Sequence, residues 1–131
     1  LGTGTGLLAF AARHLWPEAR VTATDIDPVA IEVTRENMGL NGVDGVALIV
    51  ADGARAPAIT AGAPYDLIIA NILAGPLIAM APEIAAIAAP RATLILAGLL
   101  TRQAGQVRAA YAAAGCTVAA AEERGDWTIL R

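Results

Sequence analysis

The chain has 131 residues, of which 56% are hydrophobic and 16% charged, so its composition excludes an intrinsically disordered protein and fits one folded domain. Arg supplies all nine basic side chains and Lys none, which excludes a phosphate-loop or Schiff-base Lys, and the net charge of -3 argues against a broad nucleic-acid-binding face. With one Cys and one His the chain can form neither an internal disulfide nor a Cys/His zinc site, so we expect no metal and a reducing, cytoplasmic setting.

Short apolar runs alternate with longer segments of helical spacing along the whole chain. In chain order the predicted elements are a helix at 7–15, a strand at 21–24, a helix at 28–40, strands at 46–50 and 67–70, a helix at 77–89, a strand at 93–96, a helix at 102–114, and a hairpin of 117–123 with 127–130. The four strands are apolar on both faces, as central strands of a parallel sheet are. The pattern predicts an α/β fold with a mostly parallel, doubly wound sheet that ends in an antiparallel hairpin.

The longest apolar stretch, 67–82, carries no charge but is interrupted by Asn71, Gly75 and Pro76. It falls short of the roughly 20 apolar residues that a membrane-spanning helix needs. We therefore expect no membrane association.

A glycine-rich segment, Gly2 to Gly6, stands directly before the first predicted helix. Glycines let a backbone approach a ligand closely, and the amino end of a helix favours an electronegative group. Residues 4–9 also satisfy the dinucleotide pattern with Ala as the last small residue, so an NAD-dependent oxidoreductase remains possible, as does a turn that only packs the helix.

Asp25 ends the first predicted strand, at the sheet edge where ligands of doubly wound proteins bind. Its two carboxylate oxygens suit the vicinal hydroxyls of a ribose. Asp27 is better interpreted as the cap of the helix that Pro28 begins, a stabilising role worth roughly 1 kcal/mol.

Two further strands end in polar side chains at the same edge of the predicted sheet. Asp52, followed by Gly53, is placed to accept a hydrogen bond from an amino group such as that of adenine, or to form a turn. Asn71 can both donate and accept hydrogen bonds beside such a nucleoside site, although a turn or a helix cap also explains it.

Five segments taken together resemble class I S-adenosylmethionine-dependent methyltransferases, and more narrowly the family that methylates large-subunit ribosomal protein eleven. They are residues 1–9, Asp25 to Pro28, Glu36-Asn37 with Asn41 to Val43, Ala70 to Ala74, and Gly98 to Leu100 with Gln103. The glycine segment is common to the superfamily, whereas Ala70 to Ala74, Gly98 to Leu100 and Trp127 are more selective. The resemblance extends from Leu1 beyond Trp127.

The resemblance implies a binding role for each candidate residue. Gly2, with Gly4 and Gly6, would contact the methionine part of S-adenosylmethionine, Asp25 the ribose, and Asp52 would lie near adenine. Asn71 would meet the cofactor and the incoming amine as the catalytic residue. The implied substrates are lysine and N-terminal amino groups of the ribosomal protein.

The resemblance also implies that residues 1–131 are the S-adenosylmethionine-binding methyltransferase domain of a longer protein. Its first strand and an amino-terminal substrate-recognition domain would precede Leu1. Two other functions remain open, an NAD-dependent oxidoreductase and a non-catalytic cofactor-binding module. Trp127 fits either a cover over the cofactor or an ordinary core aromatic.

Overall fold

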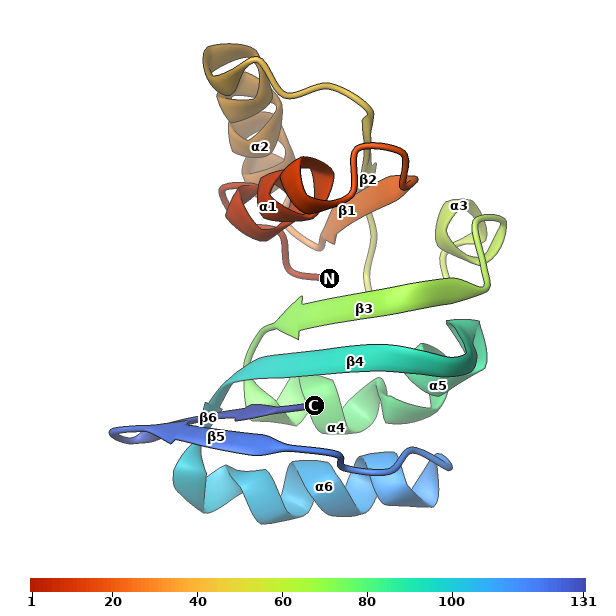
Figure 1. Ribbon diagram of the computed structural model, residues 1–131, viewed down its shortest axis with the longest axis vertical. Coiled ribbons are helices and arrows are strands. Elements are labelled where there is room, and N and C mark those ends of the chain that lie inside the picture. The colour runs from red at the N-terminus through yellow and green to blue at the C-terminus, as the bar shows by residue number, and fades with distance from the viewer. The chain divides into compact units, whose positions relative to one another are not determined.

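The computed structural model describes residues 1–131, which divide into two compact units, Leu1–Ile59 and Thr60–Arg131. In the first unit, helix α1 (Leu7–Leu15) precedes strand β1 (Val21–Asp25), helix α2 (Pro28–Asn41) and strand β2 (Val46–Val50). A single turn, α3 (Pro57–Thr60), follows at its end. Strands β1 and β2 are parallel, with Val21 opposite Val46 and Asp25 opposite Val50 (Figure 1).

Local signals in the sequence account for the ends of α2. The Asp27 carboxylate accepts a hydrogen bond from the Val29 N–H at 2.8 Å, and Pro28 occupies the first turn, where its missing N–H costs nothing. Gly42 ends the helix in the left-handed conformation, with φ of 61°. The predicted capping role of Asp27 is therefore confirmed.

The second unit is a four-stranded sheet in the order β3-β4-β6-β5, with helices packed on it (Figure 1). Its elements are β3 (Tyr65–Asn71), α4 (Ala74–Ala79), α5 (Ala81–Ile87), β4 (Ala88–Leu100), the 3-10 turn η1 (Thr101–Gln103), α6 (Ala104–Ala113), β5 (Ala121–Arg124) and β6 (Trp127–Leu130). Strands β3 and β4 are parallel, and β6 is antiparallel to both β4 and β5. The largest fully buried side chains of this unit are Leu77, Ile84, Leu99, Val107 and Thr128.

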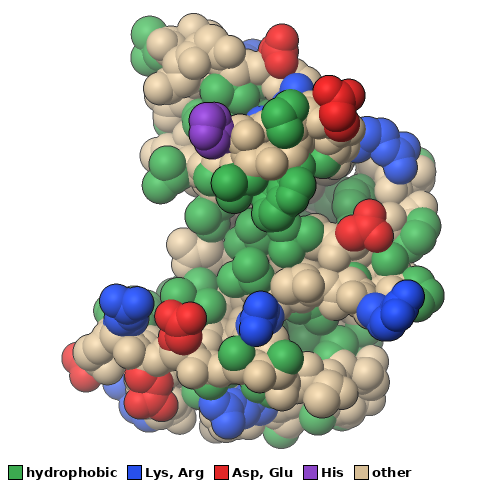
Figure 2. Space-filling view, in the orientation of Figure 1, with side chains coloured by type: hydrophobic (Ala, Val, Ile, Leu, Met, Phe, Trp, Pro, Cys, Tyr) green, Lys and Arg blue, Asp and Glu red, His purple; other side chains and the backbone are tan.

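Strand β5 forms the outer edge of this sheet, and all four of its residues are exposed. The edge carries Glu122, Glu123 and Arg124, and an ion pair of 3.7 Å joins Arg124 Nη2 to Glu122 Oε2. Acidic and basic side chains gather over the β5–β6 hairpin in Figure 2.

None of the helices combines the length and hydropathy that a bilayer-spanning segment requires.

The predicted α/β class, the parallel pairs and the closing hairpin are confirmed, but the strands are hydrogen-bonded as two sheets rather than one. The predicted helix at 77–89 is wrong in its bounds: two short helices meet at Met80, and residues 88 and 89 belong to β4. Pro82 explains the break, because a proline is tolerated in the first turn of α5 but not inside one continuous helix.

Three smaller differences concern elements whose sequence signals were weak. The helix predicted from residue 102 starts with η1, the strand at 117–123 is shortened to β5, and α3 was not predicted.

Helix α1 has the predicted bounds but no buried residue, and Leu7 and Leu15 are 71% and 63% exposed.

Candidate cofactor and substrate site

The glycine segment is a tight loop whose three glycines all have positive φ. The φ angles are 68° at Gly2, 56° at Gly4 and 92° at Gly6, a region that L side chains rarely adopt. A Cβ added at Gly4 would meet nothing within 4 Å, so this part of the loop is open to a ligand. A Cβ at Gly6 would collide with Phe10 and Thr34, so Gly6 is required for packing at the start of α1.

Helix α2 holds the loop from behind through two side chains. Thr34 Oγ1 donates to the Gly4 carbonyl at 3.0 Å, and Asn37 Nδ2 donates to the Thr5 carbonyl at 2.9 Å. Asn41 Nδ2 in turn donates to the Asn37 carbonyl at 2.8 Å. Sequence reasoning missed Thr34, whose one available signal is a polar residue on the buried side of α2.

Asp25 is bound directly to this loop. Its Oδ2 accepts from the Gly4 N–H at 2.9 Å, and its Oδ1 accepts from the Asp27 N–H at 3.1 Å. Each carboxylate oxygen has two acceptor positions, so both keep one for a ligand hydroxyl. The structure thus brings together two of the predicted cofactor-binding groups, which are 21 residues apart in the sequence.

Asp52 lies exposed in the bend that follows β2, before Gly53 with φ of 80°. This conformation supports the turn interpretation and leaves the carboxylate accessible. The Ala51 N–H donates to the Asp25 carbonyl at 2.9 Å, which ties the start of this bend to the end of β1. A contact between Asp52 and adenine stays a prediction.

Asn71 is the last residue of β3, and its side chain is exposed. It lies opposite Ala97 of β4, and the next residue, Ile72, donates its N–H to the Ala97 carbonyl at 3.2 Å. The cap of α4 is Leu73, so the helix-cap interpretation of Asn71 is wrong. The Asn71 amide is therefore available to a ligand.

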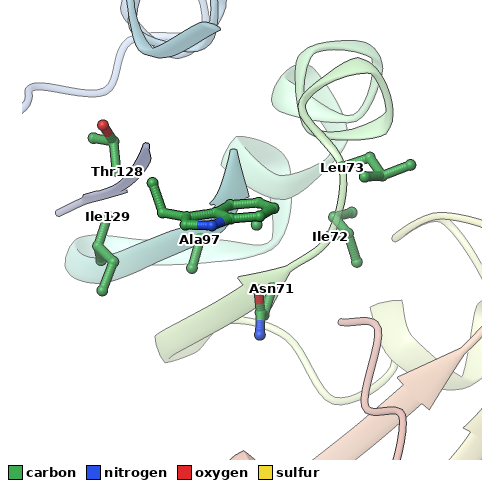
Figure 3. A pocket seen from close by; sticks show the side chains of 8 residues that line it. Asn71, Ile72, Leu73, Ala97, Thr128 and Ile129 are labelled. Atoms are coloured by element: carbon green, nitrogen blue, oxygen red, sulfur yellow. The ribbon is translucent and has the colours of Figure 1, made fainter. Parts of the chain in front are cut away.

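Asn71 borders an open pocket of about 520 Å³ in the second unit. The residues that line it are Asn71, Ile72, Leu73, Ala97, Gly98, Trp127, Thr128 and Ile129. In Figure 3, Asn71 lies at the end of β3 and Ile72 on the segment that follows, while Thr128 and Ile129 come from β6. Trp127 is 53% exposed, which rules out the core-aromatic interpretation and makes its indole part of the pocket wall.

The pocket is mostly apolar and is lined by no ionisable side chain. The Thr128 hydroxyl donates to Thr101 Oγ1 at 3.1 Å, so the Asn71 amide and the Trp127 indole N–H are the remaining polar side-chain groups of the wall. Cys116 is half-buried elsewhere in this unit, and burial raises the pKa of its thiol, which makes it a poor nucleophile. The chemistry that the pocket supports is recognition of a small group that hydrogen-bonds to an amide.

Comparison with known proteins gives one consistent result. A family model for ribosomal protein L11 methyltransferase (PrmA) matches residues 1–131. The ribosomal protein L11 methyltransferase of Agrobacterium fabrum is 48% identical over 131 residues, which are 99% of this chain and 44% of that protein. The corresponding protein of Rhizobium rhizogenes is 51% identical over 112 residues, which are 85% of this chain and 38% of that protein.

Solved structures agree with the sequence matches. A ribosomal protein L11 methylase from Lactobacillus delbrueckii subsp. bulgaricus superimposes with a TM-score of 0.90 at 30% identity, over 98% of this chain and 65% of that one. A precorrin-6y C5,15-methyltransferase from Geobacter metallireducens GS-15 has a TM-score of 0.79 at 15% identity, over 99% of this chain and 74% of that one, a likeness of fold alone. The chain spans less than half the length of the two curated relatives described above.

Proposed function

The chain belongs to the ribosomal protein L11 methyltransferase family, and we propose that residues 1–131 form the part of such an enzyme that binds S-adenosylmethionine and transfers its methyl group. The proposed acceptors are lysine and N-terminal amino groups of ribosomal protein L11. Because ribosomal proteins work in the cytoplasm, we propose a cytoplasmic enzyme.

One observation supports the cofactor assignment most directly, the hydrogen bond of 2.9 Å between the Gly4 N–H and Asp25 Oδ2. It joins an open glycine loop to a carboxylate that keeps acceptor capacity for ribose hydroxyls. We assign Gly2, Gly4 and Gly6 to the methionine end, with Gly6 acting through packing, Asp25 to the ribose and Asp52 to the adenine. When bound, S-adenosylmethionine supplies an electrophilic methyl group on a positively charged sulfur.

The protein must also present an uncharged amine. At pH 7, deprotonating a lysine with a pKa of about 10.4 costs roughly 4.6 kcal/mol, whereas an N-terminal amine with a pKa near 7.7 costs only about 1 kcal/mol. An apolar environment disfavours the ammonium form and so lowers the pKa of the amine. The pocket beside Asn71 provides this environment, because it is mostly apolar and is lined by no carboxylate.

We assign to Asn71 the orientation of the amine. Solvent takes the proton of the ammonium group. The Asn71 amide oxygen can then accept an N–H of the neutral amine, which directs the nitrogen lone pair toward the methyl carbon. Well-oriented reacting groups reach effective molarities of about 10⁵–10⁸ M, so alignment alone can supply most of the acceleration. This function requires no dedicated base.

Calorimetric titration of the intact protein with S-adenosylmethionine and with NAD tests the cofactor. We expect S-adenosylmethionine to bind and NAD not to bind, and the opposite result would favour the oxidoreductase. Transfer of labelled methyl groups from S-adenosylmethionine to purified ribosomal protein L11 tests the reaction. Binding without transfer would identify a non-catalytic cofactor-binding module instead.

A further inference from the structure

Strand β4 contains a β-bulge at Ala97 and Gly98, where it passes the pocket. On one side of the bulge Leu96 lies opposite Leu130, and on the other side Leu99 lies opposite Thr128. Strand β4 thus advances three residues while β6 advances two. Gly98 has φ of 80°, in the left-handed region that favours glycine. Bulges of this kind bend a strand locally and re-aim the side chains near it.

On one side, the bulge touches the backbone that follows Asn71. A Cβ placed on Gly98 would lie 2.5 Å from the Ile72 carbonyl oxygen, and 2.9 Å from both its carbonyl carbon and its nitrogen. These are backbone atoms, so no side-chain rotation could relieve the overlap. Any side chain at position 98 would therefore displace Ile72 and, with it, the adjoining Asn71.

On the other side, the bulge sets the register of β6. Beyond it, Leu99 and Leu100 of β4 lie opposite Thr128 and Trp127. Because side chains alternate between the faces of a strand, removing the extra residue would shift this pairing by one position and turn the affected side chains to the other face. The same bulge therefore places Trp127 in one pocket wall and permits the Asn71 segment to form the other.

We propose that Gly98 is a positioning residue for methyl transfer, which it serves by holding the Asn71 segment and Trp127 at the spacing that the incoming amine needs. This inference rests on the proposed function. Gly98 makes no side-chain contact with a ligand. It contributes because the missing Cβ lets β4 approach the Ile72 backbone closely. A misplacement of about 1 Å can cost roughly 100-fold in rate, so the effect should be large.

The test compares Gly98→Ala with Gly105→Ala in the intact protein. Gly105 lies in α6, has an ordinary φ, and would place its Cβ in open space, so it is a matched control for a glycine-to-alanine change. We expect kcat to fall about 100-fold in Gly98→Ala, as misalignment of reacting groups predicts, and to stay unchanged in Gly105→Ala. The affinity for S-adenosylmethionine should fall far less than kcat does, because the glycine loop and Asp25 are not altered and only the contact from Asn71 is affected.

Two further measurements separate positioning from a general loss of stability. Asn tolerates a positive φ but carries a Cβ, so Gly98→Asn should lose kcat as Gly98→Ala does. In a Trp16→Phe background Trp127 is the remaining tryptophan, and its emission should change in both Gly98 variants while cofactor binding persists.

Retained kcat in either Gly98 variant would overturn the proposal, and so would a loss of kcat that only parallels a loss of cofactor binding. A wild-type protein that transfers no methyl group would instead refute the proposed function, and this inference with it. The two failures are thus distinguishable, because the wild-type measurement comes first.

Discussion

At the scale of single residues, Asn71 has a chemical role that can be separated from stability. Its side chain is exposed at the end of β3 and does not cap α4, so its removal leaves the packing intact. We expect Asn71→Ala to lower kcat about 100-fold, because the orientation of the amine is lost. The melting temperature should change little, as is usual for substitutions of exposed residues. Steady-state kinetics and a thermal melt measure the two effects. Unchanged methyl transfer with the cofactor still bound would contradict the assignment.

Tyr111 presents a second prediction, which concerns stability alone. It is 3% exposed, and its hydroxyl lies buried without a hydrogen-bond partner. Since an unsatisfied buried hydroxyl is destabilising, we expect Tyr111→Phe to raise the free energy of unfolding by about 1 kcal/mol. Urea denaturation of both proteins measures the change. The half-buried Tyr65 supplies the control, because Tyr65→Phe should bring no such gain.

Tyr111 also makes the stability of the protein depend on pH in the alkaline range. Burial raises the pKa of Tyr111 in the folded state above its ordinary value. A raised folded pKa contributes stability that is present below the unfolded pKa of about 10 and is lost as the pH rises further. Above pH 10, the free energy of unfolding should therefore fall more steeply with pH in the wild type than in Tyr111→Phe. Urea denaturation at several pH values measures the difference.

At the scale of elements, the cap of α2 stabilises the helix and, through it, the glycine loop against which the helix packs. Asp27→Ala removes the hydrogen bond to the Val29 N–H and should cost about 1 kcal/mol of unfolding free energy. Chemical denaturation measures the loss. Glu36→Ala, which alters an exposed acidic residue of the same helix, should have a much smaller effect. Equal effects of the two substitutions would show that the cap is not the cause.

The start of β4 contains a residue in an unfavourable conformation. Arg91 has φ of 65°, the one non-glycine residue of the chain with positive φ. We expect Arg91→Gly to stabilise the protein by about 0.5–1 kcal/mol, because glycine adopts this region without steric cost. Arg91→Ala is the control, since it removes the side chain but keeps the strained φ. A gain in both variants by thermal denaturation would locate the cause in the side chain instead.

Elements with strong local signals were predicted well, and those set by tertiary pairing were not. The bounds of α1 and β2 agree with the predictions because glycine, apolar runs and polar flanks define them locally. The position of Asp25 at the end of a strand was predicted, whereas its hydrogen bond with the Gly4 N–H was not. The bulge at Gly98 depends on the register between β4 and β6, which no local pattern encodes, and the Thr34 contact depends on how α2 packs.

At the scale of the whole molecule, cofactor binding should be measurable as stability. A ligand that binds only the folded state, present at 100 times its dissociation constant, adds about 2.7 kcal/mol to the free energy of unfolding. We expect S-adenosylmethionine to raise the melting temperature of the intact protein accordingly, and NAD at the same concentration to leave it unchanged. A thermal-shift titration gives the result, and a shift with NAD alone would contradict the cofactor assignment.

The exposed strand β5 has a consequence for behaviour in concentrated solution. An edge strand offers unpaired backbone groups to which the strand of another molecule could add, the first step toward fibrils. Here Glu122, Glu123 and Arg124 stand along that edge, so an incoming strand would have to desolvate several charges. The hairpin thereby protects this side of the sheet from aggregation, and neutral residues at these three positions would make the protein more prone to precipitate.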